Sequence, residues 1–179
     1  MFLPRSYFVV NIYSLGKNGV IIDELSKQVI IEIKNKTGFS IGDKIINLMS
    51  FNMLGKMEWD FVFDNQTIFK LQKKFLESSI YLRYLFEGKY YDLFKIRVYN
   101  VFLPFLTGIK IESKDGLKLD CKKKDFLDYE IVDNEGVSYC LISKRGGFKE
   151  EYHVRVVNFL EGVNNYIFLS IPLIISVFY

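Results

Sequence analysis

The stretch YIFLSIPLIISVFY, residues 166–179, decides the fold. It contains no charged residue. It is 14 residues long, or 17 when counted from Val163, whereas a membrane-spanning helix needs about 20 apolar residues. Pro172 also interrupts it. The segment is either a helix buried in the core of the protein or a short tail anchor, and its length favours the buried helix.

The chain before this segment consists of short runs with strand-type patterns. In Lys56–Phe63 the side chains of Trp59, Phe61 and Phe63 alternate with Glu58 and Asp60, so the aromatic rings share one face. Turn signals such as Asp115-Gly116 separate the runs. The predicted strands are Ser6–Tyr13, Gln28–Lys34, Asp43–Met49, Lys56–Phe63, Thr67–Phe75, Ile80–Phe86, Tyr90–Tyr99, Gly108–Ser113, Leu117–Lys122, Asp128–Val132, Val137–Lys144 and Tyr152–Val157.

Composition supports the same architecture. The chain has 179 residues, 50% of them hydrophobic and 17% aromatic, and it has no alanine. Alanine is the best helix former and aromatic residues suit strands, so a helix bundle is excluded. A closed sheet of about twelve strands has an interior too wide for its own side chains. We therefore predict one domain, residues 1–179: a mainly β, closed antiparallel barrel that encloses the hydrophobic C-terminal helix, residues 163–179.

A unit of the sequence is used twice. Asp23 starts a turn that leads into the strand Val29–Ile33, and Asp133 starts a turn that leads into Val137–Ile142. Each strand ends at a basic corner with a Gly-Phe pair, at Phe39 and Phe148. The repetition indicates that one architecture runs through the chain.

Chemistry-bearing motifs are sparse. His153 is the single histidine, and the two cysteines, Cys121 and Cys140, have no metal-ligand spacing and are expected to be buried free thiols. No nucleophile elbow, phosphate loop or dinucleotide motif is present. The net charge of +3 is too balanced for a dedicated nucleic-acid binder. These features predict a cytoplasmic protein that is not an enzyme and has no cofactor or metal.

Clustered basic residues in the second half are the best functional lead. Cations near an anionic bilayer contribute about 1 kcal/mol each to binding, so the cluster predicts contact with phospholipid headgroups. The alternative is a set of ordinary solvated turns, because several acids lie nearby. The candidate residues are Lys118, Lys122, Lys123, Lys124, Lys144, Arg145 and Lys149.

Several short motifs resemble the LURP-one-related family, of its bacterial type, within the tubby C-terminal-like superfamily. The corner Gly38–Ile45 (GFSIGDKI) is similar to an aromatic-Ser-x-Gly-Asp-Lys corner, and Asp128–Asp133 (DYEIVD) to a Tyr-Glu-Ile-x-Asp strand. Ile142–Lys144 followed by Tyr152 is similar to an Ile-Ser-Lys-Lys stretch and its following strand. The departures are Pro172, in the terminal helix, and Gly146-Gly147, where the family often has an aromatic residue. The region 51–85 matches by pattern alone.

The resemblance implies a roughly twelve-stranded barrel around a central helix. In this superfamily the tubby proteins bind phosphoinositides and the scramblases are tied to membranes. It supplies no catalytic residue and no phosphoinositide motif for this chain. We expect a non-enzymatic binding or adaptor barrel whose partner is an anionic membrane surface or a protein. The alternatives are a scramblase-like, membrane-associated protein that uses the C-terminal apolar segment, and a plain enzyme. The expected location is cytoplasmic, peripheral at the membrane if the basic loops bind lipid, and the oligomeric state is open.

Overall fold

The computed structural model describes residues 7–13, 18–37, 56–99, 108–145 and 150–178. Within these ranges the chain forms twelve strands and a C-terminal helix preceded by a single 3-10 turn. The elements are β1 (Tyr7–Tyr13), β2 (Asn18–Asp23), β3 (Val29–Asn35), β4 (Met57–Phe63), β5 (Gln66–Lys73), β6 (Ser79–Phe86), β7 (Lys89–Tyr99), β8 (Gly108–Ser113), β9 (Lys118–Lys123), β10 (Asp128–Asp133), β11 (Ser138–Arg145), β12 (Glu150–Val156), η1 (Gly162–Asn165) and α2 (Tyr166–Phe178).

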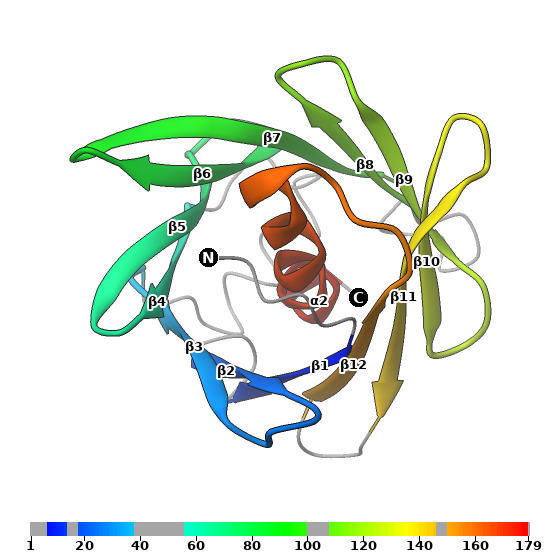
Figure 1. Ribbon diagram of the computed structural model, residues 1–179. Helices are drawn as coiled ribbons and strands as arrows, with labels where there is room; N and C mark the ends of the chain where they lie inside the picture. Colours follow the sequence, from blue (N-terminus) through cyan, green and yellow to red (C-terminus); the bar gives the residue numbers. More distant parts are fainter. Residues whose placement is uncertain (1–6, 14–17, 38–55, 100–107, 146–149, 179) are drawn as a thin grey trace.

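The strands form one closed antiparallel barrel in which each strand pairs with its neighbours in sequence. The barrel closes where β1 pairs with β12, through Val9 opposite His153 and Val10 opposite Tyr152. Figure 1 looks along the barrel and shows α2 inside the ring of strands. The predicted fold class, a closed antiparallel barrel that encloses the C-terminal helix, is therefore confirmed.

Helix α2 fills the barrel. Every residue from Ile167 to Phe178 is buried, Pro172 included, and the helix is continuous through the proline. The ring of Tyr166 packs 4.6 Å from that of Phe69 on β5, and Phe168 lies 6.5 Å from Tyr139 on β11. Fully burying one large apolar side chain contributes about 1.5–3 kcal/mol, so α2 is a major part of the core. No helix in the described residues has the length and hydropathy of a membrane span.

Strand β2 differs from the sequence-based expectation. None of its residues, Asn18–Asp23, lies in a predicted strand, and Asn18-Gly19, which has the composition of a turn, begins it. A Cβ atom on Gly19 would lie 2.5 Å from the carbonyl oxygen of Asn11 on β1, so only glycine fits there. The predicted strand Asp43–Met49 and the corner Gly38–Ile45 lie outside the described residues.

A bulge in β4 changes the predicted alternation of its side chains. Trp59 and Phe61 are buried as expected, but the pairing with β5 shifts between Phe61 and Val62. Val62 is then 8% exposed and Phe63 is 52% exposed. The prediction that Phe63 shares the inward face of Trp59 is wrong, because a bulge reverses the faces beyond it.

The meander gives the barrel two different ends. The turn end is formed by the connections β2–β3, β4–β5, β6–β7, β8–β9 and β10–β11 and by the entry of α2. Its turns are built from local chemistry: Oδ1 of Asp23 accepts from the backbone N–H of Leu25 and Ser26, and Oδ1 of Asp133 accepts from Glu135 and Val137. The repeated unit seen in the sequence is thus a repeated aspartate-capped turn. The connections β5–β6 and β9–β10 lie at the opposite end, the rim.

Candidate functional site

The basic rim comprises the loop between β9 and β10, with Lys122–Leu127, and the end of β11 at Lys144 and Arg145. The loop is held at its base, where Lys124 N–H donates to the Asp128 carbonyl at 2.9 Å. It is also tied to β11, because Lys144 N–H donates to the Leu127 carbonyl at 2.8 Å. The structure therefore joins two sequence clusters that are about twenty residues apart at one place on the barrel.

The tip of this loop is apolar. Phe126 is 80% exposed and Leu127 is 45% exposed, while Oδ1 of Asp125 accepts from Phe126 N–H at 2.7 Å. The ammonium group of Lys123 lies 5.2 Å from the centre of the Phe126 ring. The loop tip thus presents an aromatic ring and a cation side by side to the outside of the barrel.

The remaining basic residues of the rim differ in whether their charged groups form ion pairs. Lys122 and Arg145 are exposed and have no ion pair with any described residue. Lys124 Nζ lies 2.8 Å from Glu130 on β10, and the hydrogen bond it donates holds the pKa of Glu130 below its usual value. Lys122, Lys123 and Arg145 are therefore the cations most available to an external anion.

Lys144 serves the interior of the barrel instead. It alternates with buried Cys140 and Ile142 on the inward face of β11, and its Nζ lies 3.3 Å from Glu150. The Ser176 hydroxyl of α2 donates to the same carboxylate. This chain of contacts fastens the end of α2 to the wall, so Lys144 has a structural role.

Tyr152 completes the interior cluster beside Lys144. The Lys144 ammonium lies 5.5 Å from the centre of the Tyr152 ring, which is fully buried. Burial, and then the charge of Glu150, raise the pKa of Tyr152. Its hydroxyl therefore stays protonated at neutral pH and is a structural rather than an acid–base group.

Two candidate residues lie elsewhere. Lys118 begins β9 opposite Glu112, toward the turn end. Four residues of strand, at about 3.3 Å each, separate it from Lys122 at the rim. It belongs to a different surface, described below. Lys149 lies outside the described residues.

A second apolar tip lies at the same end of the barrel and was not predicted from the sequence. The β5–β6 connection carries Phe75, 60% exposed, and Leu76, 58% exposed, directly after two lysines. Lys74 Nζ lies 3.9 Å from Glu77, and burial lowers the pKa of Lys73 to about 8, an effect that Glu77 partly offsets. The signal that could have found both tips is a Phe-Leu pair that follows lysines in a connection, at Phe75 and at Phe126.

The two cysteines lie in the core of the barrel, and the histidine lies at its seam. Cys121 and Cys140 are buried free thiols, and burial raises the pKa of Cys121 to about 12, so its thiol is unreactive. No group of three or more His, Cys, Asp or Glu side chains in the described residues could hold a metal ion. His153 lies 2.8 Å from Glu151 and 3.6 Å from Glu24, at the seam that closes the barrel.

Comparisons of the chain with protein-family models, with curated proteins and with solved structures give no match. The resemblance to the LURP-one-related family stays a prediction.

Proposed function

We propose that this barrel is a non-enzymatic binding module whose basic rim contacts the headgroups of an anionic membrane. The observation that carries the proposal is Phe126, 80% exposed at a loop tip, with the Lys123 ammonium 5.2 Å from its ring centre and with exposed Lys122 and Arg145 at the same end of the barrel. An apolar group that enters the interface, with cations around it that meet the headgroups, is the chemistry of peripheral membrane binding.

The expected strength follows from these groups. Three available cations contribute about 1 kcal/mol each near an anionic surface, and burial of the Phe126 ring adds about 1.5–3 kcal/mol. Lys124 contributes less, because Glu130 neutralises it at 2.8 Å. The sum predicts weak, reversible binding that falls with salt.

The placement of the second tip supports a flat target. The connections β5–β6 and β9–β10 are at the same end of the barrel, so Phe75 and Phe126 can meet one surface together. The turn end also exposes apolar side chains, but its turns carry more acids than bases: Glu24, Asp64, Glu87, Asp115 and Glu135 against Lys27 and Lys114. An anionic membrane would repel that end.

Flotation with vesicles tests the proposal. The full chain should float with vesicles of phosphatidylcholine mixed with phosphatidylserine and should not float with phosphatidylcholine alone. Phe126→Ser should weaken the binding by a factor between about 10 and about 100, since the ring accounts for about 1.5–3 kcal/mol. The matched control is Phe86→Ser, which removes a ring that is 52% exposed at the turn end and should change nothing.

Equal loss in both variants, or no binding to anionic vesicles, would overturn the proposal. Binding to an acidic protein without binding to vesicles would make the rim a protein-docking surface instead. The alternative in which the C-terminal segment enters the bilayer requires α2, buried from Ile167 to Phe178, to leave the barrel, and we do not propose it.

A further inference from the structure

A hollow of about 350 Å³ lies on the outer face of β7, β8 and β9 and is bounded by Asn134 of the β10–β11 turn. Two carboxylates, from Glu112 and Asp120, take part in its lining. The four cationic side chains that line it are Lys95, Arg97, Lys110 and Lys118. Four positive and two negative groups leave the hollow with a local charge of +2.

The cations of the hollow stand opposite carboxylates in the strand register, Lys95 and Lys118 opposite Glu112 and Lys110 opposite Asp120, but none forms a close ion pair with a described residue. Within the described residues none of the four lies within 4.0 Å of a carboxylate oxygen. Arg97 stands directly opposite Lys110 on the neighbouring strand, and a like-charge pair in this position destabilises a sheet. Lys110 is held over the ring of Tyr99, 5.3 Å from its centre. Arg97 therefore has a cation rather than a carboxylate opposite it, and an external anion would relieve that repulsion.

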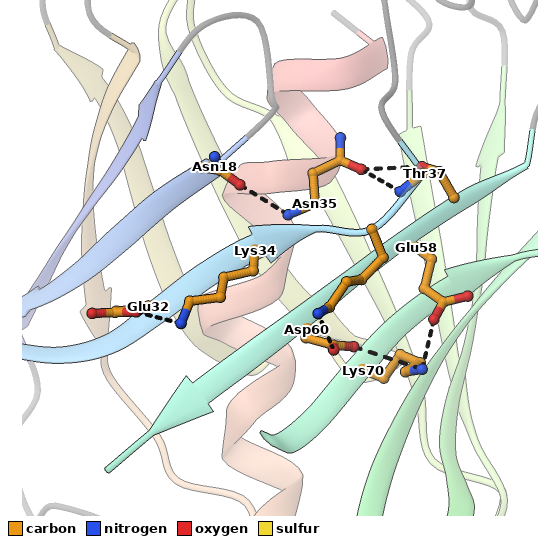
Figure 2. A network of polar contacts seen from close by, with 9 residues as sticks. Asn18, Glu32, Lys34, Asn35, Thr37, Glu58, Asp60 and Lys70 are labelled. Carbon is orange, nitrogen blue, oxygen red and sulfur yellow. Dashed lines mark hydrogen bonds and ion pairs between the residues drawn. The ribbon is translucent and has the colours of Figure 1, made fainter. Parts of the chain in front are cut away.

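The opposite arrangement occurs on the adjoining wall, from β3 to β7. Figure 2 shows Lys70 between two carboxylates, with Nζ 2.6 Å from Glu58 and 3.6 Å from Asp60. Farther along the same wall, Arg83 Nε lies 2.6 Å from Asp92. Among the described residues, the fold thus forms close ion pairs on one part of its outer wall and none within 4.0 Å for the cations of the hollow.

A smaller, more apolar hollow adjoins the first. Its volume is about 220 Å³, and Tyr81 and Leu93 contribute to its lining. Lys95 and Glu112 line both hollows, so the two lie next to each other. A ligand that reaches from one to the other would place an anionic group among the cations and an apolar or aromatic part beside Tyr81.

We propose that the hollow of β7–β9 binds a small molecule that carries a phosphoryl group. Arg97 presents a planar set of donors that fits two phosphoryl oxygens, and Lys95 and Lys110 supply further charge-assisted hydrogen bonds. The volume lies within the range of about 300–1,000 Å³ that small-molecule sites occupy. This site is separate from the basic rim and does not depend on membrane binding there.

Titration calorimetry on the full chain tests the site with two probes, inorganic phosphate and phenyl phosphate. Both should bind saturably, and phenyl phosphate should bind more tightly because its ring can occupy the smaller hollow. Arg97→Gln and Lys110→Gln should each weaken binding about tenfold, since each removes a hydrogen bond to a charged group. Lys89→Gln is the matched control: it removes one charge from the same strand, β7, outside the hollow, and should change affinity less than about twofold.

Vesicles containing phosphatidic acid distinguish a lipid phosphoryl group from a soluble one. If vesicles bind and Arg97→Gln abolishes that binding while neither free probe binds, the phosphoryl group belongs to a lipid. If the free probes bind and Phe126→Ser leaves their affinity unchanged, the ligand is soluble and the site is independent of the rim. The site is refuted if inorganic phosphate, phenyl phosphate and the vesicles all fail to bind saturably. It is also refuted if Lys89→Gln weakens binding as much as Arg97→Gln does.

Discussion

The two ends of the barrel differ in what their connections do. At the turn end, side chains cap the backbone, as Asp23 and Asp133 do, and tight turns place Asn65 and Gly88 at positive φ. At the rim, the described connections hold lysines and exposed Phe-Leu pairs that make few contacts with the fold. The difference teaches that side-chain caps fix several turns at the turn end, whereas the described rim connections carry exposed Phe-Leu pairs beside lysines, the groups on which the proposed function rests.

Both ends of the barrel rest on the same core, so a core substitution should destabilise both ends together. Phe168→Ala deletes a fully buried ring of α2 and should lower the free energy of unfolding by about 3–5 kcal/mol. Chemical denaturation measures this loss. A stable barrel without the ring would mean that α2 is not the core element on which both ends rest.

Asp23→Ala probes the turn end directly. Asp23 is 3% exposed and accepts two backbone hydrogen bonds, so its removal should cost about 1–3 kcal/mol. The matched variant at the rim is Asp125→Ala, which removes one exposed acceptor and should cost less than about 0.5 kcal/mol. Similar losses in the two variants would erase the contrast between the ends.

The rim lysines should differ among themselves in vesicle binding. Lys122→Gln removes a cation that has no ion pair within 4.0 Å among the described residues and should weaken binding to anionic vesicles about fivefold, corresponding to about 1 kcal/mol. Lys124→Gln should have a smaller effect, because Glu130 already neutralises that charge. The reverse order would show that the ion pair does not control which cations meet the membrane.

The smallest effect concerns the acid dependence of stability. The hydrogen bond from Lys124 holds the pKa of Glu130 below its ordinary value of 4.5, so the pair stabilises the fold above that value. This contribution is lost as the pH falls through the lower pKa of the folded state. Lys124→Gln should therefore lose less stability than the wild type between about pH 6 and about pH 3 in denaturant titrations. An identical loss of unfolding free energy in the two proteins on acidification would mean that the Lys124–Glu130 pair adds nothing to the stability of the fold.

Much of the fold could be predicted because its signals are local. The alternation of Trp59 and Phe61 and the charge-free run before Phe178 each depend only on neighbouring residues. The place of Gly19 in β2 depends instead on the carbonyl of Asn11 across the sheet. The bulge after Phe61 likewise depends on the pairing with β5. Neither contact leaves a local pattern.

The candidate site was predictable only in part for the same reason. Lys122 and Lys123 are adjacent in sequence and stay together at the rim, whereas the strand length of β9 carries Lys118 toward the turn end. Lys144 follows the inward alternation of β11 and meets Glu150 and Ser176, which come from later elements. The basic run was visible in the sequence, but the face that each lysine takes depends on strand register.

The most direct test of the central claim, that the rim lies on an anionic membrane, is the fluorescence of Phe126→Trp. The native Trp59 is 1% exposed and should give a constant background. On addition of vesicles containing phosphatidylserine, the emission of the new tryptophan should shift to shorter wavelength, with no shift for phosphatidylcholine alone or for the turn-end control Phe86→Trp. The absence of a shift with anionic vesicles, or an equal shift at Phe86→Trp, would contradict the account.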